Sequence, residues 1–144
     1  MINISSIKRH RKRLHLTALV TGFLLCVFVF GASCSAIPGA DECNAVVDSF
    51  MKAAAQKDVD SAYNLCVEEM AYEDIENLVL EDNEFFAGYQ NIKMKGINIE
   101  YKENHNYAEY EGEAYYSGDQ VRSVEAELIL RGENWEIVSI YVSL

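Results

Sequence analysis

The spacing of the apolar residues changes part-way along this chain, and that change restricts the fold more than any other feature. Between Val46 and Val79 apolar residues recur every three or four positions, which is typical of helices with one buried side. From Ile97 onward they alternate with polar residues, which is typical of strands with one buried face. Helices followed by consecutive strands predict an α+β domain with a mainly antiparallel four-stranded sheet.

The boundaries of these elements follow from the same spacing. We expect helices over residues 41–56 and 59–70, with Asp41 as the N-cap of the first, and a weaker helix around residues 75–79. Strands are expected at residues 97–101, 107–116, 121–130 and 135–142. Residues 117–120 and 131–134 supply the last two turns.

The buried face of the sheet can be predicted by pairing strands. A turn at residues 131–134 places Trp135 opposite Leu130, and regular pairing continues from there. The inner face then holds Val124, Ala126, Leu128, Leu130, Trp135, Ile137, Ser139 and Tyr141. Burial favours an odd loop or a bulge before residue 121, with Gly118 at positive φ, because that register leaves Glu109, Glu111 and Glu113 in solvent.

Small residues in mid-strand on this inner face, ringed by aromatic ones, leave two alternatives open. Either the face encloses a pocket for a small apolar or aromatic ligand, or the first helix packs into the space and fills it. The residues that would line such a pocket are Tyr63, Tyr110, Gly112, Tyr116, Ala126, Trp135, Ser139 and Tyr141.

The N-terminal segment has the layout of an export signal or membrane anchor. Five basic residues lie in the first 13 positions, and 27 residues without Asp, Glu, Lys or Arg follow, at positions 14–40. The basic side of such a segment stays cytoplasmic while the rest crosses the membrane. We therefore expect a signal peptide or anchor at residues 1–34, a tether at 35–41 and an extracytoplasmic domain at 42–144.

The mode of attachment remains open between three alternatives. Gly31-Ala32-Ser33-Cys34 resembles a bacterial lipobox, in which Cys34 would carry a lipid, although Gly31 departs from the usual Leu, Val or Ile. An uncleaved membrane anchor and simple cleavage near Ala36 are the alternatives. Two further cysteines, Cys43 and Cys66, lie in the exported domain, and we expect free thiols because the two helices would hold them at different heights.

The charge of the domain bears on its partners. The chain has a formal net charge of -11, and 7 basic against 23 acidic residues lie from Ser35 onward. Such an acidic domain repels nucleic-acid backbones, so no nucleic-acid partner is expected. A protein partner with basic patches would be attracted to the outer sheet face, and a homodimer through this face is the alternative.

The domain resembles the nuclear-transport-factor-2-like superfamily, which has a cystatin-like cone fold, and in particular its small exported bacterial members of unknown function. The resemblance rests on three stretches, namely residues 57–63, 85–92 and 132–137. It implies a curved sheet wrapped around helices. It implies little about activity, since this fold carries enzymes, binding proteins and assembly modules.

Few residues in the domain suggest catalysis or metal binding. His105 lies in a turn-like stretch, and residues 81–84 form an acidic bend that lacks the spacing of a calcium loop. We expect no cofactor, no metal and no catalytic residue. The leading hypothesis is non-catalytic binding of a small ligand or protein partner, and the alternatives are a cone-fold enzyme of isomerase, dehydratase or hydrolase type, with Tyr63 or Tyr110 as a pocket hydroxyl, or a structural envelope component.

Overall fold

The computed structural model describes residues 38–102 and 105–143. The expected signal or anchor segment, which includes Cys34, lies outside the described residues. Ile37–Leu144 forms a compact unit of its own. Among the described residues, no helix combines the length and the apolar character needed to cross a membrane.

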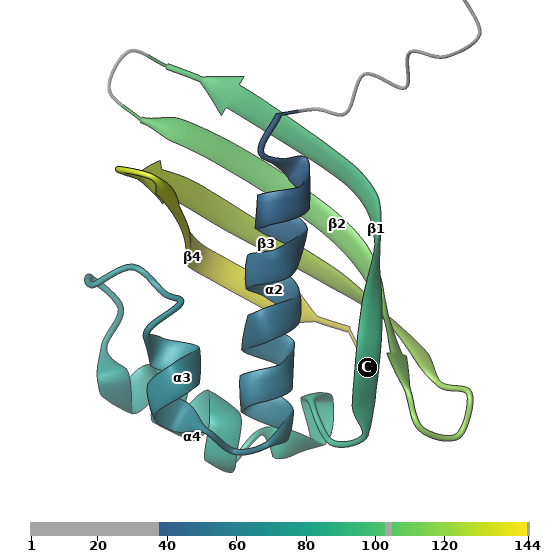
Figure 1. Cartoon of the computed structure of the whole chain (residues 1–144). Helices are drawn as coiled ribbons and strands as arrows, with labels where there is room; N and C mark the ends of the chain where they lie inside the picture. The colour runs from purple at the N-terminus through teal and green to yellow at the C-terminus, as the bar shows by residue number, and fades with distance from the viewer. Residues whose placement is uncertain (1–37, 103–104, 144) are drawn as a thin grey trace, which may run out of the picture. The chain divides into compact units, whose positions relative to one another are not determined.

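Helices precede a four-stranded sheet in this unit. The helices are α2 (Ala40–Ala55), α3 (Val59–Tyr63) and α4 (Tyr72–Leu80), followed by the short 3-10 helix η1 (Asn83–Phe85). The strands are β1 (Tyr89–Tyr101), β2 (Asn106–Tyr116), β3 (Val121–Arg131) and β4 (Asn134–Val142), all antiparallel in the order β1-β2-β3-β4. The sheet curves behind α2, which crosses one of its faces, while α3 and α4 lie near the end of α2 (Figure 1). The predicted α+β class is confirmed.

The core lies between α2 and the sheet. The side of α2 that faces the sheet repeats at helical spacing, and its fully buried residues are Cys43, Val47, Phe50, Met51 and Ala54. The sheet contributes Ala108, Tyr110, Ala114, Tyr116, Val124, Ala126, Leu128, Trp135, Ile137 and Val142. Cys43 and Cys66 are buried free thiols, as expected.

Two helix boundaries differ from the prediction. The N-cap of α2 is Gly39, in the left-handed conformation with φ of 85°, and Asp41 lies one residue inside the helix. The second helix ends at Tyr63 because the chain after it pairs with β4. There the amide of Val67 donates to the carbonyl of Ile137, and the amide of Ile137 donates to the carbonyl of Leu65. These bonds cover part of the β4 edge.

The first strand begins at Tyr89, well before the predicted start at Ile97. Its register against β2 shifts twice, between Tyr89 and Asn91 and between Met94 and Gly96. Each shift interrupts the alternation of side chains, so the early part of the strand lacks the period-two pattern.

The turn between β2 and β3 confirms the predicted odd loop. Tyr115 pairs with Val121, and the amide of Tyr116 donates to the carbonyl of Gln120. Gly118 has φ of 80°, as expected, and Asp119 follows at 59°. This register places Glu109, Glu111 and Glu113 on the face of the sheet away from α2.

Candidate functional site

The centre of the inner face, where the sequence left a pocket open, is filled by a side chain of the sheet itself. Tyr110 and Gly112 lie two residues apart on the same face of β2. A Cβ added at Gly112 would lie 2.7 Å from the Tyr110 hydroxyl and 3.1 Å from Cδ1 of Ile92. Tyr110 therefore leans along its strand and covers the glycine, instead of leaving the space to the first helix.

Two polar residues of α2, Asn44 and Asp48, accept hydrogen bonds from tyrosines of the sheet. The Tyr110 hydroxyl donates to Oδ1 of Asn44 at 2.7 Å, and the Tyr89 hydroxyl donates to Oδ1 of Asp48 at 2.7 Å. Asp48 also pairs with Lys52, and only 23% of its side chain is exposed. Burial first, and then the bond to Asp48, raise the pKa of Tyr89, while burial raises that of Tyr110. Asp48 is an inward carboxylate that the sequence analysis did not predict.

Two of the predicted lining residues, Ser139 and Tyr141, face away from the core. Pairing is regular as far as Ile137 opposite Leu128, and the register then shifts by one residue. The extra residue is Val138, so Ser139 pairs with Glu127 and Tyr141 with Glu125 on the outer face. Tyr141 is 64% exposed. The prediction for these two residues is wrong, because a β-bulge inverts the end of the strand.

The other predicted lining residues lie in or beside the core without forming one common site. Tyr116, Ala126 and Trp135 are buried. The Tyr116 hydroxyl donates to the carbonyl of Phe85 at 2.7 Å. Tyr63 is half-buried on α3 and packs edge-to-face on Tyr72 of α4, with ring centroids 5.2 Å apart.

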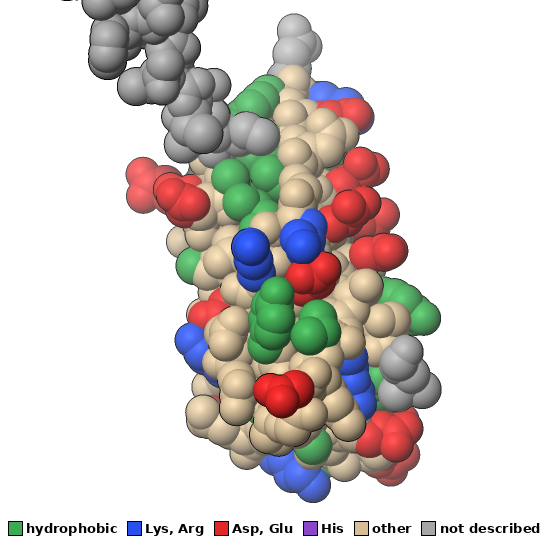
Figure 2. Space-filling model, turned by 90° about the vertical axis from the view of Figure 1, so that its right-hand side faces the viewer, with side chains coloured by type: hydrophobic (Ala, Val, Ile, Leu, Met, Phe, Trp, Pro, Cys, Tyr) green, Lys and Arg blue, Asp and Glu red, His purple; other side chains and the backbone are tan. Residues whose placement is uncertain are grey.

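The outer face of the sheet carries two pairs of glutamates in direct opposition. Glu109 on β2 pairs with Glu127 on β3, and two residues along the strands Glu111 pairs with Glu125. All four side chains are exposed. Like charges in direct opposition on a sheet destabilise it. Acidic side chains gather along the margin of the molecule that corresponds to this face (Figure 2).

Within the described residues, no Lys or Arg side chain forms an ion pair with these four carboxylates. Nδ2 of Asn98 donates to Glu109 at 3.3 Å, and the Ser139 hydroxyl donates to Glu127 at 3.2 Å. Nearby lysines are engaged elsewhere, since Lys95 pairs with Glu113 and Lys102 with Glu100. The Lys95 ammonium holds the pKa of Glu113 below its ordinary value.

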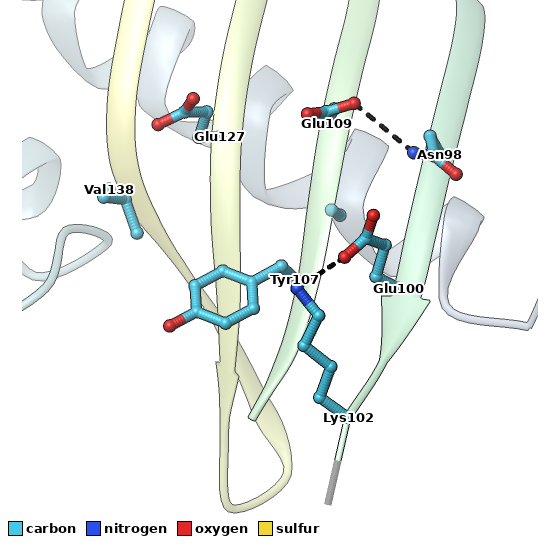
Figure 3. Close-up of a pocket in the computed structure, with 8 residues that line it drawn as sticks. Asn98, Glu100, Lys102, Tyr107, Glu109, Glu127 and Val138 are labelled. Atoms are coloured by element: carbon cyan, nitrogen blue, oxygen red, sulfur yellow. Dashed lines mark hydrogen bonds and ion pairs between the residues drawn. The ribbon is translucent and has the colours of Figure 1, made fainter. Parts of the chain in front are cut away.

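A groove of about 440 Å³ crosses the strands at the first glutamate pair (Figure 3). All four strands contribute to its lining. The lining residues are Asn98, Glu100, Lys102, Tyr107, Ala108, Glu109, Glu127 and Val138. Tyr107 is 41% exposed. The groove thus offers carboxylates, an aromatic ring and an aliphatic side chain to whatever binds there. It also contains the Lys102 ammonium, which pairs with Glu100 and lies 5.8 Å from the centroid of the Tyr107 ring.

Within residues 38–102 and 105–143, no group of three or more His, Cys, Asp or Glu side chains is arranged to hold a metal ion. His105 is exposed, as the sequence suggested. The acidic bend at residues 81–84 has a structural use that sequence did not reveal. Nδ2 of Asn83 donates at 3.0 Å to the carbonyl of Ala54 on α2 and to that of Val79 on α4, which ties the two helix ends together.

Solved structures with the same architecture identify the fold. An NTF2-like protein from Campylobacter jejuni, proposed to be a transpeptidase, has a TM-score of 0.53 and 15% identity, over 65% of this chain and 94% of its own. A protein of unknown function with a cystatin-like fold, from Nostoc punctiforme, has a TM-score of 0.55 and 10% identity, over 70% of this chain and 86% of its own.

The chain has the NTF2-like, cystatin-like fold. No protein-family model matches its sequence, and the comparison with curated proteins gave no match. At identities this low the likeness establishes the NTF2-like fold and leaves the activity to be argued from the site.

Proposed function

We propose that this NTF2-like domain is an extracytoplasmic binding module, held at the membrane by its N-terminal segment, which binds a protein partner through the outer face of its sheet. One observation carries the choice of surface. The inner space, for which a ligand pocket was one of two alternatives, is occupied by Tyr110, whose hydroxyl lies 2.7 Å from Asn44, whereas the groove and the unpaired carboxylates lie on the outer face.

The composition of the outer face supports this choice. Tyr107 and Tyr141 are among the large side chains most exposed in the described residues, and both lie on this face next to glutamates. Tyrosine is enriched at protein interfaces because its ring buries apolar area while its hydroxyl keeps a hydrogen bond. The adjoining carboxylates would direct a partner of opposite charge to the face.

Site-specific photo-crosslinking tests the surface in cells. Tyr141 is replaced by the photoreactive residue benzoylphenylalanine in the full chain, and Tyr72, exposed on α4, receives the same change as a control. We expect an adduct with another protein from position 141 and none from position 72. Mass spectrometry identifies the protein in any adduct. Equal adducts from both positions, or an adduct only with a second copy of this chain, would contradict partner binding through this face.

The proposed attachment is tested separately. The basic and apolar residues of the N-terminal segment support it, and lipidation at Cys34 or an uncleaved anchor would serve equally well. Cells are grown with an alkyne-bearing fatty acid, and the wild-type chain is compared with Cys34→Ser. Labelling lost in the variant would assign the lipid, and membrane association without labelling would assign the anchor. Recovery of wild-type protein in the soluble fraction alone would contradict tethering.

A cone-fold enzyme is the second candidate, and Asp48 is the observation that favours it. Its carboxylate is half-buried and accepts a hydrogen bond from the Tyr89 hydroxyl at 2.7 Å, and a carboxylate paired with a hydroxyl in this way can take part in proton transfer. Hydrolysis of 4-nitrophenyl acetate is a simple probe of the hydrolase type. Turnover by the wild type that both Asp48→Asn and Tyr89→Phe abolish would favour the enzyme over the binding module.

A further inference from the structure

The spacing of the outer-face glutamates matches the repeat of an extended chain. The two opposed pairs, Glu109 with Glu127 and Glu111 with Glu125, are two residues apart along β2 and β3. Two residues of a strand advance about 6.6–6.8 Å, and opposed side chains on neighbouring strands are about 5 Å apart. An extended peptide presents alternate side chains to one side at the same interval of about 6.6–6.8 Å.

We infer that the outer face binds an extended segment of its partner that carries Lys or Arg at alternate positions, one basic side chain above each glutamate pair. This inference rests on the proposed function and names the kind of partner that the same surface would take. Each basic group would have two carboxylates within reach, and the segment would run along β2 and β3.

Charge complementarity supports a basic occupant. Within the described residues no Lys or Arg pairs with these four glutamates, although Lys95 and Lys102 neutralise neighbouring ones. The sheet therefore retains two repulsive pairs that a bound cation would relieve. Arg or Lys from a partner would replace that repulsion with up to four ion pairs on one face.

Aromatic side chains beside the carboxylates add a second kind of contact. Tyr107 precedes Glu109 by two residues on the same face and lines the groove, and Tyr141 lies opposite Glu125. A guanidinium stacks favourably on the exposed ring of Tyr141, whereas the Lys102 ammonium of this chain already lies 5.8 Å from the centroid of the Tyr107 ring. The side chain of Val138, exposed in the groove by the bulge, offers apolar surface to the aliphatic stem of the basic residue.

Two isomeric peptides test the spacing directly. The alternating probe is acetyl-Thr-Arg-Thr-Arg-Thr-amide, and its isomer acetyl-Thr-Arg-Arg-Thr-Thr-amide has the same charge with adjacent arginines. Binding to the full chain in zwitterionic micelles is followed by the NMR shifts of the β2 and β3 amides. We expect the adjacent isomer to bind about fivefold more weakly, which corresponds to the loss of one exposed ion pair. Equal affinities would overturn the match of spacing.

Paired variants test the location of the site. Glu109→Gln with Glu127→Gln should weaken the alternating probe about tenfold. Glu73→Gln with Glu76→Gln changes the net charge equally at exposed positions of α4 and should leave the affinity unchanged. Equal losses in the two variants would reduce the binding to general attraction and overturn the inference. If crosslinking at position 141 succeeds while the peptides fail both tests, the binding module stands and only the basic segment is rejected.

Discussion

The hydroxyl of Tyr110 on β2 donates a 2.7 Å hydrogen bond to Oδ1 of Asn44 on α2. The bond passes through the core that separates the helix from the sheet, and the Tyr110 ring covers Gly112 on the way. One side chain therefore occupies the space over Gly112 and also bonds the helix to the sheet. This is why the proposed binding surface is the other face of the sheet.

Tyr110→Phe is expected to lower the free energy of unfolding by about 1–2 kcal/mol, because the side-chain oxygen of Asn44 loses its donor while the ring still fills the core. Urea denaturation followed by circular dichroism measures the change. Tyr72→Phe is the matched control, since its hydroxyl bonds to Asp60 at an exposed site and should matter by only a few tenths of a kcal/mol. Equal losses would show that the Tyr110 bond does not anchor the helix.

Deleting Val138 should leave the domain folded and change the free energy of unfolding by less than about 1 kcal/mol, because Val138 is the extra residue of the bulge. Without this residue β4 would pair regularly with β3, with Ser139 still opposite Glu127 and Tyr141 opposite Glu125 on the outer face, and Val142 still buried. Thermal unfolding measures the effect. Val138→Ala keeps the bulge and should cost less than about 1 kcal/mol, since the residue is only partly buried. A loss of about 3 kcal/mol or more in the deletion variant would contradict this register, because it would mean that the deletion turns the end of β4 over.

Val138 also marks where prediction from the sequence ends. Pairing from the turn at residues 131–134 correctly placed Trp135 opposite Leu130 and Ile137 opposite Leu128. Burial of alternate residues correctly selected the odd loop around Gly118. Both arguments use the alternation of apolar and polar residues along a strand, which the folded strands keep in these regions. A bulge breaks that periodicity without a signal in residue type, so the outward positions of Ser139 and Tyr141 could not be predicted.

Contacts between elements that are far apart in the sequence could not be predicted either. Asp48 is one acid among many on the sequence, and only the packing of α2 against β1 brings it to Tyr89. The glutamates of β2 were correctly predicted to face solvent. Their opposition to Glu127 and Glu125 follows from the β2–β3 register that the odd loop around Gly118 sets.

Gly39→Ala should destabilise the domain by about 2 kcal/mol, and Gly118→Ala by about 1 kcal/mol. Both glycines have positive φ, so both variants carry the backbone strain of a left-handed residue. Only at Gly39 would the added Cβ meet a neighbour, the indole of Trp135 at 3.3 Å, while nothing lies within 4 Å of a Cβ at Gly118. Chemical denaturation gives the difference between the two. Equal losses of stability would show that the Trp135 ring can move away from the added Cβ without a cost in free energy.

The two domain thiols should react slowly and should make stability fall at high pH. Burial raises the pKa of Cys43 and of Cys66 to about 12, with a smaller contribution from Glu42 at Cys43. Both thiols are largely neutral in either state below about pH 8, and an ordinary thiol is about half ionised near pH 8.5–9. As the pH rises from about 9 to 12, the unfolded chain ionises and the folded one does not, so the free energy of unfolding decreases.

The reaction with Ellman's reagent at pH 8 checks the first part, in a full chain with Cys26 and Cys34 replaced by Ala. We expect labelling only at the rate of unfolding, which mild urea should accelerate. For the second part, Cys43→Ala with Cys66→Ala should flatten the fall of stability above pH 9. Rapid labelling of the native chain would contradict the burial of these thiols.

Glu109→Gln with Glu127→Gln should raise the free energy of unfolding by about 0.2–1 kcal/mol, even though the same change weakens the proposed binding. The two carboxylates are in direct opposition and no cation of the described chain pairs with them, so neutralising them removes repulsion. The gain in stability should be smaller at 1 M salt, where screening shortens the range of the repulsion to about 3 Å. Urea denaturation at low and high salt measures both. Glu73→Gln with Glu76→Gln should show no such gain, because those residues lie on α4 away from the opposed pairs and the charge of Glu73, in the first turn, favours the helix. A stability gain that accompanies a loss of peptide affinity is the result expected of charges kept for a partner, and a loss of stability in the sheet variant would instead show that these glutamates support the fold.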